Sequence, residues 1–319
     1  MSVSGIAAYV EYGKQSNFTT AVSAGAATRA FGMDQDFTPP EIDESMFVLG
    51  DLNTVLVQKF AFGKFSATFS VDWTLSNPWW IDWVLGLTSS SGAAPTTHTW
   101  DDSKTVNAFT VEYGLDTVTD RVIQLNRCVA SDVQVAGSID EVVKCHGSFQ
   151  AGKTAATAGT SLDASVVSDD ITTPYTVVHG TVENPSGTIL AEVQNFELNL
   201  NPNIKYVYGI DTTASEAGFA QNAYKGRLDI SGSFELSIKD NTWWNLVRAR
   251  AEPTNNTLRI KCTNGGAGAA ERSMQFTMTG LGLGKHGSKY RKYDLATEKI
   301  PFVARDITVV AVNNISAVP

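Results

Sequence analysis

Residues 63–86 read GKFSATFSVDWTLSNPWWIDWVLG, and the first half of this stretch alternates strictly between apolar and polar residues. Every second residue from Phe65 to Leu75 is apolar, whereas the residues between them are small or polar. A period of two over eleven residues places one set on each face of an extended chain. The stretch therefore predicts a long, half-buried β-strand.

The second half of the stretch carries the signals of a short helix. Asn77 is suited to cap the start of a helix, and Pro78 is suited to its first turn, where a missing N–H costs nothing. Trp79 and Trp80 follow, and Gly86 is placed to end the helix. We expect a strand, a cap and a tryptophan-rich helix that seats on the protein core.

The same pattern occurs again at residues 226–247, GRLDISGSFELSIKDNTWWNLV. Leu75 corresponds to Ile238, 163 positions later, and Trp79 corresponds to Trp243, 164 positions later. The difference is one extra residue in the second turn, where insertions are tolerated. Amphipathic strands can resemble each other by composition alone, but composition would not repeat both the cap and the tryptophan pair.

The correspondence extends outward and predicts two tandem domains. Three upstream positions recur 159 residues later, with Phe37, Phe47 and Gly50 matching Phe196, Tyr206 and Gly209. We expect one domain over residues 1–160 and its duplicate over residues 161–319, divided within a stretch rich in Ala, Thr, Gly and Ser. We expect Pro39 and Pro40 to break the chain before a short strand at residues 46–49, and two separate strands at residues 121–127 and 131–135. Many short strands with one helix per repeat predict a mainly β protein. Its form would be two β-sandwich or barrel-like domains, each flanked by one short α-helix.

The composition narrows the class of function. The 319 residues carry a formal net charge of −9, which argues against a protein that holds nucleic acid by neutralising phosphates. Charged residues make up 18%, a low fraction that is typical of surfaces that meet other subunits. No long apolar stretch or basic leader is present, so we expect neither secretion nor a membrane partner.

No combination of residues predicts catalysis. The three cysteines are an odd number without metal-ligand spacing, and we expect buried, reduced thiols. The four histidines stand in no metal or nucleophile motif. The glycines and lysine at residues 280–285 lack the spacing of a phosphate-binding loop. We therefore expect no enzyme activity, no catalytic residue, no cofactor and no metal.

One segment concentrates positive charge in this acidic protein. Residues 285–293 read KHGSKYRKY. They form either a solvated loop or a docking loop for an acidic patch on a neighbouring subunit. The candidate docking residues are Lys285, Lys289, Arg291 and Lys292.

Three stretches carry a resemblance to a known family. They are YVEYG at residues 9–13, the strand and aromatic helix at residues 63–86, and the strands within residues 106–152. In this order, and with the second copy, they resemble the tail tube proteins of long-tailed phages and related tailed viruses, in a tandemly duplicated form. The similarity spans nearly the whole chain, and the order of elements carries it, since no single motif is diagnostic.

The resemblance implies a structural protein of the virion tail, assembled in the host cytoplasm. Family members fold as a β-sandwich with one flanking helix, and their sheets join edge to edge into a closed barrel. Stacked rings form the channel through which viral DNA leaves. The implied partners are further copies of the chain, the tape measure, terminator and distal tail proteins, and DNA in transient, non-specific passage.

The resemblance also implies roles for two loops, at residues 51–62 and 210–224. Each would contact the adjacent ring. The candidate stacking residues are Asp51, Leu56, Lys59, Phe60, Asp211, Glu216, Phe219 and Tyr224.

A ring of six single domains is the family's usual plan, so a duplicated chain implies a homotrimer with pseudo-sixfold symmetry. The polar residues of the long strands are then candidates to line the channel. They are Ser66, Thr68, Ser70, Asp229, Ser231 and Glu235. The strand pattern alone leaves open which face is luminal.

A second class of function is a carbohydrate-binding or adhesive double β-sandwich, and an enzyme is a third. A binding module of that kind should remain a small soluble species, whereas a tube subunit should form long hollow polymers. Electron microscopy of the purified protein distinguishes the two.

Overall fold

The protein is mainly β, as the sequence predicts. The computed structural model describes residues 7–23, 28–50, 57–92, 95–116, 121–154, 173–183, 190, 193–210, 216–238, 245, 257–266, 270–284, 287–289 and 296–314. Within these residues the strands form two large sheets and one small one, and every strand pair is antiparallel.

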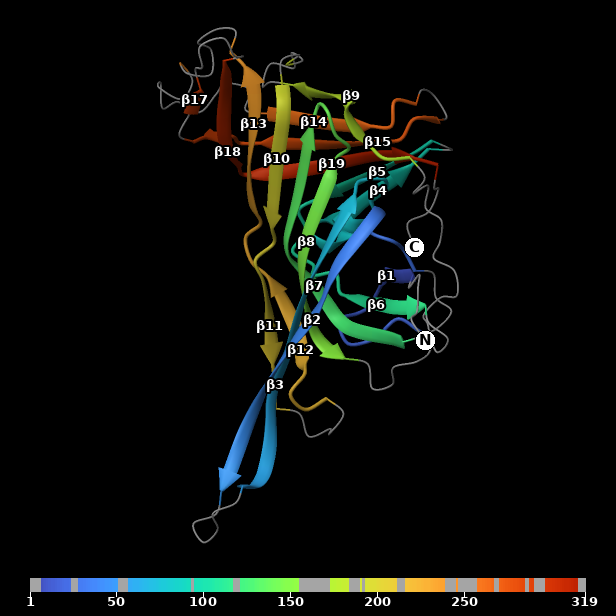
Figure 1. Ribbon diagram of the computed structural model, residues 1–319, viewed down its shortest axis with the longest axis vertical. Helices are drawn as coiled ribbons and strands as arrows, with labels where there is room; N and C mark the ends of the chain where they lie inside the picture. Colours follow the sequence, from blue (N-terminus) through green and yellow to red (C-terminus); the bar gives the residue numbers. More distant parts are fainter. Residues whose placement is uncertain are drawn as a thin grey trace, which may run out of the picture.

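The larger sheet has eleven strands in the described part of the chain and follows the long axis of the molecule (Figure 1). Its main path runs β16 (Gly282–Leu283), β18 (Thr297–Ala304), β13 (Asp229–Ser237), β10 (Val193–Asn201), β7 (Arg121–Ser138), β8 (Lys144–Thr154), β3 (Val57–Thr74) and β2 (Met33–Gly50). Off this path, β17 (Gly287–Lys289) pairs with β18, and β6 (Phe109–Asp116) pairs with β7 and with β1 (Ala7–Lys14).

The second sheet crosses the first near one end of the molecule (Figure 1). Its order is β4 (Gly86–Ser91), β5 (Thr96–Asp101), β19 (Asp306–Asn313), β15 (Ser273–Thr279), β14 (Thr257–Thr263) and β9 (Thr176–Glu183). A small sheet pairs β11 (Ile204–Tyr208) with β12 (Ala220–Lys225). Both large sheets contain strands from either side of residue 160, and the expected domain boundary itself lies outside the described residues.

The apolar sides of the two large sheets enclose one hydrophobic core. Along β3 the predicted alternation holds, because Phe65, Phe69, Val71 and Trp73 are buried while the residues between them are not. Phe276 of β15, in the second sheet, is fully buried in the same cluster. This is the arrangement of a β-sandwich, in which alternate residues of each sheet supply the interior.

The expected α-helix after the first long strand is wrong. Trp79–Trp83 instead forms η1, a 3₁₀ helix, and all five of its residues are buried. The side chain of Asn77 does accept a hydrogen bond, from the backbone N–H of Trp79 at 3.2 Å. A single turn is too short to propagate as an α-helix, so its conformation is set by the side chains that pack around it.

The tryptophans of η1 connect the two sheets. Trp80 lies edge-on to Trp73 of β3, with ring centroids 5.6 Å apart, and Trp79 lies 6.1 Å from Trp100 of β5. Trp83 stacks on Phe109 at 4.0 Å. The predicted seating role is therefore confirmed for Trp79 and Trp80. The expected second helix, with its tryptophan pair, lies outside the described residues.

Two expected chain breaks are continuous strands. Pro39 and Pro40 do not end the early strand, because β2 continues through them with a bulge between Thr38 and Glu41. Prolines are tolerated there because β2 ends the sheet and needs no ladder bond on its outer side. The two strands expected in residues 121–135 are one strand, β7, with a bulge between Ala130 and Asp132.

The pairing registers of the two halves follow the offsets seen in the sequence. Phe37 of β2 lies opposite Val71 of β3, while Phe196 of β10 lies opposite Phe234 of β13. The first members of these pairs are 159 positions apart, and the second members are 163 apart. The β2–β3 hairpin thus corresponds in register to the hairpin formed by β10, β11, β12 and β13.

The three cysteines are buried and unpaired with one another, as predicted. Burial raises the pKa of the Cys262 thiol to about 12, and it also raises the pKa of Cys128 and Cys145. None of the helical residues that the structure describes belongs to a segment long and apolar enough to span a bilayer.

Candidate assembly surfaces

The face of the larger sheet that points away from the core is polar. Cross-strand partners lie on the same face, so the register identifies its members. Thr68 and Ser70 of β3 lie opposite Gln150 and Ser148 of β8, and none of these four side chains is buried. The candidate lumen residues all lie on this polar face or at its end: Ser66, Thr68, Ser70, Asp229, Ser231 and Glu235.

Acidic residues predominate on the polar face. Its acidic members by register are Asp36, Glu41, Asp43, Asp72, Asp132, Glu197, Asp229 and Glu235. Its lysines are Lys64 of β3, Lys144 of β8 and Lys299 of β18. The acidic contribution of β2 was not identified from the sequence, because the proline pair was taken to end that strand. The alternation of Asp34, Asp36 and Thr38 was the available signal.

Side-chain amides donate hydrogen bonds to one of these carboxylates. The side chain of Glu197 accepts hydrogen bonds from Asn199 at 3.0 Å and Gln134 at 2.8 Å. The bond from Asn199 lowers the pKa of Glu197 most, against the opposing effect of burial. Glu197 therefore keeps its charge well below neutral pH. For Asp132 the effect of partial burial is larger than that of its neighbours, and it raises the pKa of that carboxyl.

The main path of the larger sheet has two ends that are unpaired on their outer sides in the described part of the chain, and a side branch off β7 ends at β1. β2 ends one side, and β16 and β17 together end the other. Each exposes a row of backbone donors and acceptors to which another strand can add. Of the candidate docking residues, Lys289 lies in β17, whereas Lys285, Arg291 and Lys292 lie outside the described residues.

The described half of the first expected stacking loop, residues 57–62, is strand. β2 and β3 continue toward residues 50 and 57, and together they form an arm that extends beyond the sandwich (Figure 1). Lys59 and Phe60 are therefore strand residues of the arm, opposite Leu49 and Val48. Asp51 and Leu56 lie outside the described residues. The assignment of residues 57–62 to a loop is wrong, because pairing with β2 extends that far.

The second expected loop contacts the first half of the chain. Glu216 accepts hydrogen bonds from Arg127 at 2.6 Å and from Lys153 at 2.5 Å. Phe219 packs edge-on against Phe65 at 5.4 Å. Tyr224 is exposed in β12, so residues 220–224 are strand and not loop, while Asp211 lies outside the described residues.

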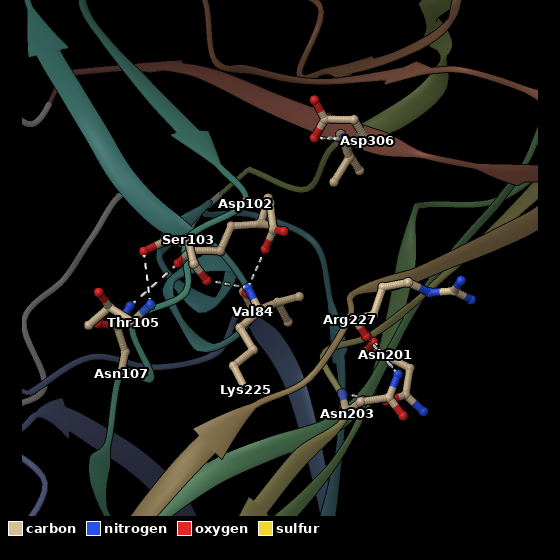
Figure 2. Close-up of polar contacts among 12 residues, drawn as sticks. Val84, Asp102, Ser103, Thr105, Asn107, Asn201, Asn203, Lys225, Arg227 and Asp306 are labelled. Atoms are coloured by element: carbon tan, nitrogen blue, oxygen red, sulfur yellow. Dashed lines mark hydrogen bonds and ion pairs between the residues drawn. The ribbon is translucent and has the colours of Figure 1, made fainter.

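Lys225, at the end of β12, makes a further link to the first half (Figure 2). Its ammonium donates to the carbonyl oxygens of Val84 at 2.8 Å and Ser103 at 2.9 Å, and to the carboxylate of Asp102 at 2.6 Å. Its side chain is only 3% exposed. These partners are distant in sequence and sit in no motif, so sequence reasoning missed Lys225 and Arg127.

No arrangement for catalysis appears in the described residues. No group of three or more His, Cys, Asp or Glu side chains is placed there to hold a metal ion. His146 pairs with Asp72 at 2.7 Å on the polar face, and His98 contacts Ser90 and Asn313. Nothing in this part of the chain supports the carbohydrate-binding alternative.

The described residues form three kinds of surface suited to contacts with other subunits: a polar sheet face, the unpaired sheet ends and a projecting arm. The sequence profile of the family described as "Phage tail tube protein" matches residues 5–284. The chain belongs to this family. A search of curated protein sequences found no match.

Membership of the tail tube family makes the chain a structural component of the virion tail. Such a protein assembles with further copies of itself and with other tail proteins. The match spans both halves of the chain and ends at residue 284, directly after β16. The unpaired sheet ends and the arm are therefore the candidate assembly surfaces.

Proposed function

We propose that this tail tube protein forms rings of three copies, which stack into the hollow tube through which viral DNA passes on ejection. The observation that carries the proposal is the continuous antiparallel sheet, which has one polar, acidic face and two unpaired ends. Joining such sheets end to end closes a barrel and removes the two free edges of the main path.

The proposed threefold ring rests on treating the two halves as repeats. Residues 1–160 and 161–319 would each occupy one of six equivalent places in the ring. The matching registers of the two hairpins support this division. Strands of both halves belong to the same large sheets, and this is compatible with the division. The two halves of one chain would then join each other in the same way as the halves of neighbouring copies.

The polar face would line the channel. Phosphate adhesion needs lysine or arginine to displace counterions, and a predominantly acidic surface offers few of them. The apolar face cannot serve, because the second sheet covers it. We therefore place Ser66, Thr68, Ser70, Asp229, Ser231 and Glu235 toward the lumen and expect no enzyme activity.

The tip of the β2–β3 arm would contact the adjacent ring. Other proposed partners are the tape measure, terminator and distal tail proteins at the ends of the tube, with assembly in the host cytoplasm. The test is a cryo-electron microscopy reconstruction of the purified protein. We expect stacked rings of three copies with the polar face inward. A protein that remains a small soluble species, or rings of six copies, would contradict the proposal.

A further inference from the structure

A groove of about 690 Å³ opens at the β16 end of the larger sheet. Its lining comes from the segment before β13, the turn that leads into β16 and the end of β18, and it includes Leu228, Gly280, Val303 and Arg305. Val303 of β18, next to the end of the sheet, lies opposite Ser231 and so belongs to the polar face where that face borders the groove; its side chain is 57% exposed.

The corresponding place in the first half of the chain is filled. There the hydroxyl of Tyr206, in β11, donates to the carbonyl oxygens of Arg127 at 2.6 Å and Gln150 at 2.7 Å. The hydroxyl of Tyr208 donates to the carbonyl of Phe65 at 2.9 Å. The β11–β12 hairpin thus packs against the first half of the chain, and its tyrosines bind backbone carbonyls that would otherwise be left without these hydrogen bonds.

The pairing of β7 with β8 corresponds position by position to that of β16 and β17 with β18. Ala130 lies opposite Phe149, and Leu283 lies opposite Phe302, 153 positions later in both members. Beyond a bulge the offset holds again. Val135 lies opposite Cys145, and Ser288 lies opposite Glu298.

The backbone at the groove repeats this correspondence. Arg127 has a φ of 57°, an uncommon value for a residue other than glycine, and its counterpart 153 positions later is Gly280, with a φ of 66°. By the same offset Gln150 corresponds to Val303. Phe65 corresponds to Leu228, 163 positions later. The three groups bound by Tyr206 and Tyr208 therefore have all their counterparts in the lining of the groove.

The occupant of the groove follows from the hairpin registers. Tyr206 of β11 lies opposite Ala223, and 159 positions earlier Phe47 of β2 lies opposite Ala61. The β2–β3 arm is thus the counterpart of the β11–β12 hairpin. It cannot fill the groove of its own chain, because β2 and β16 end opposite sides of the sheet.

We propose that the β2–β3 arm of one copy docks in the Gly280 groove of the neighbouring copy in the same ring. The inference rests on the proposed ring, and it names the surfaces that join the copies. Strand direction allows it: the path from β16 to β2 has eight antiparallel strands, so β2 of the next copy continues the alternation. The groove also carries two arginines, Arg305 and the 89% exposed Arg227, which pairs with Asp229 at 2.7 Å, and an acidic β2 is compatible with them.

A cysteine pair tests this contact directly. A Cβ built on Gly152 would lie 2.7 Å from the Cβ of Ala220, which is closer than two Cβ atoms in a disulfide. The counterpart of Gly152 carries a Cβ, so a separation larger by about 1 Å is expected between the counterparts of these two positions, and it brings them within reach of a disulfide. By register those counterparts are Arg305 and Lys59, because Ala220 pairs with Tyr208 as Lys59 pairs with Leu49. After oxidation of assembled Lys59→Cys/Arg305→Cys, we expect covalent dimers and trimers on non-reducing gels. The matched Phe60→Cys/Arg305→Cys protein, in which the first cysteine is shifted by one position along β3, should show at least about ten-fold less cross-linked product.

A second variant needs no disulfide. Val303→Asp should leave the subunit folded, because the side chain is exposed, yet it should lower the assembled fraction about ten-fold or more by placing an unpaired charge in the contact. Val178→Asp, at an equally exposed valine of β9, should assemble normally. Tubes of wild-type protein with no cross-link and normal Val303→Asp assembly would overturn the docking proposal alone. Failure of the wild-type protein to form any ring would overturn the proposed function and this inference with it.

Discussion

The ammonium of Lys225 lies 2.6 Å from the carboxylate of Asp102, an ion pair between residues 123 positions apart in the chain. Lys225 belongs to β12, whereas Asp102 follows β5, so the pair ties the hairpin of one half to the sandwich edge of the other. Lys225 also donates to two backbone carbonyls, so one buried ammonium group makes three contacts with the first half of the chain.

Replacing Lys225 should therefore destabilise the subunit. Lys225→Met keeps the aliphatic stem but removes the charge and three hydrogen bonds, and we expect a loss of about 2–3 kcal/mol in the free energy of unfolding. Lys205→Met, at an exposed lysine of β11, is the control and should stay within about 0.5 kcal/mol of wild type. Urea unfolding followed by tryptophan fluorescence measures both. Equal midpoints for the two variants would show that the Lys225 contacts contribute little.

Trp80 should be a main anchor of the sandwich. Its side chain is fully buried between the sheets, so Trp80→Ala should cost about 3–5 kcal/mol through lost packing and a cavity. Its indole nitrogen has no hydrogen-bond partner among the described residues, so Trp80→Phe should cost less. Thermal unfolding provides the comparison, and the sequence repeat predicts the same for Trp244→Ala. Unchanged melting temperatures for both alanine variants would refute the seating role.

Much of this architecture could be predicted from the sequence. The alternation in residues 65–75 gave the correct buried face of β3, and the offsets of 159 and 163 matched the pairing of Phe37 and Phe196 with their partners. These are local patterns, and strand periodicity reports burial directly. The helix type was not predictable, because the packing of Trp79–Trp83 between two sheets decides it.

The assembly surfaces were less visible in the sequence. Glu216 looked like a loop residue available to another ring, but its carboxylate is held by Arg127 and Lys153. Contacts between residues 89 and 63 positions apart leave no local signature. The proline pair in β2 hid the acidic edge for a related reason: a bulge on an end strand has the same sequence signal as a chain break.

The Glu216 cluster should make stability depend on pH. Burial would raise the pKa of Glu216, but hydrogen bonds from Lys153 and Arg127 lower it below its usual value of 4.5. A lowered folded-state pKa stabilises the protein above the unfolded-state value, and this contribution is lost as pH falls through the folded-state value. Glu216→Gln should therefore be about 1–3 kcal/mol less stable than wild type at pH 7, and the gap should narrow below pH ~4. Urea unfolding at both pH values tests this, and a gap that does not change with pH would contradict it.

The tip of the arm should be needed for stacking and not for folding. Replacing residues 51–56 with a two-residue turn leaves the described strands β2 and β3 intact. We expect folded protein that forms single rings but no tubes in negative-stain images. The matched change at residues 211–215 is expected to leave stacking intact, because the neighbouring Glu216 and Phe219 contact the chain's own first half. Normal tubes from the 51–56 variant would exclude the stacking role.

The orientation of the polar face can be tested with DNA. Thr68 and Ser231 occupy corresponding positions 163 residues apart, and both lie on the polar face. In a ring of three copies, Thr68→Lys/Ser231→Lys would place six added charges around the channel. Lysines there should retain double-stranded DNA within the tube at low salt and release it as salt rises, because bound phosphates exchange with counterions. Val178→Lys adds half as many charges, three per ring, on the second sheet, where retention should be absent and any binding should be at the outer surface. DNA held inside Thr68→Lys/Ser231→Lys tubes, seen as density in cross-section, would fix the polar face as luminal. Binding confined to the outside of those tubes would instead place that face outward and overturn the proposed channel lining.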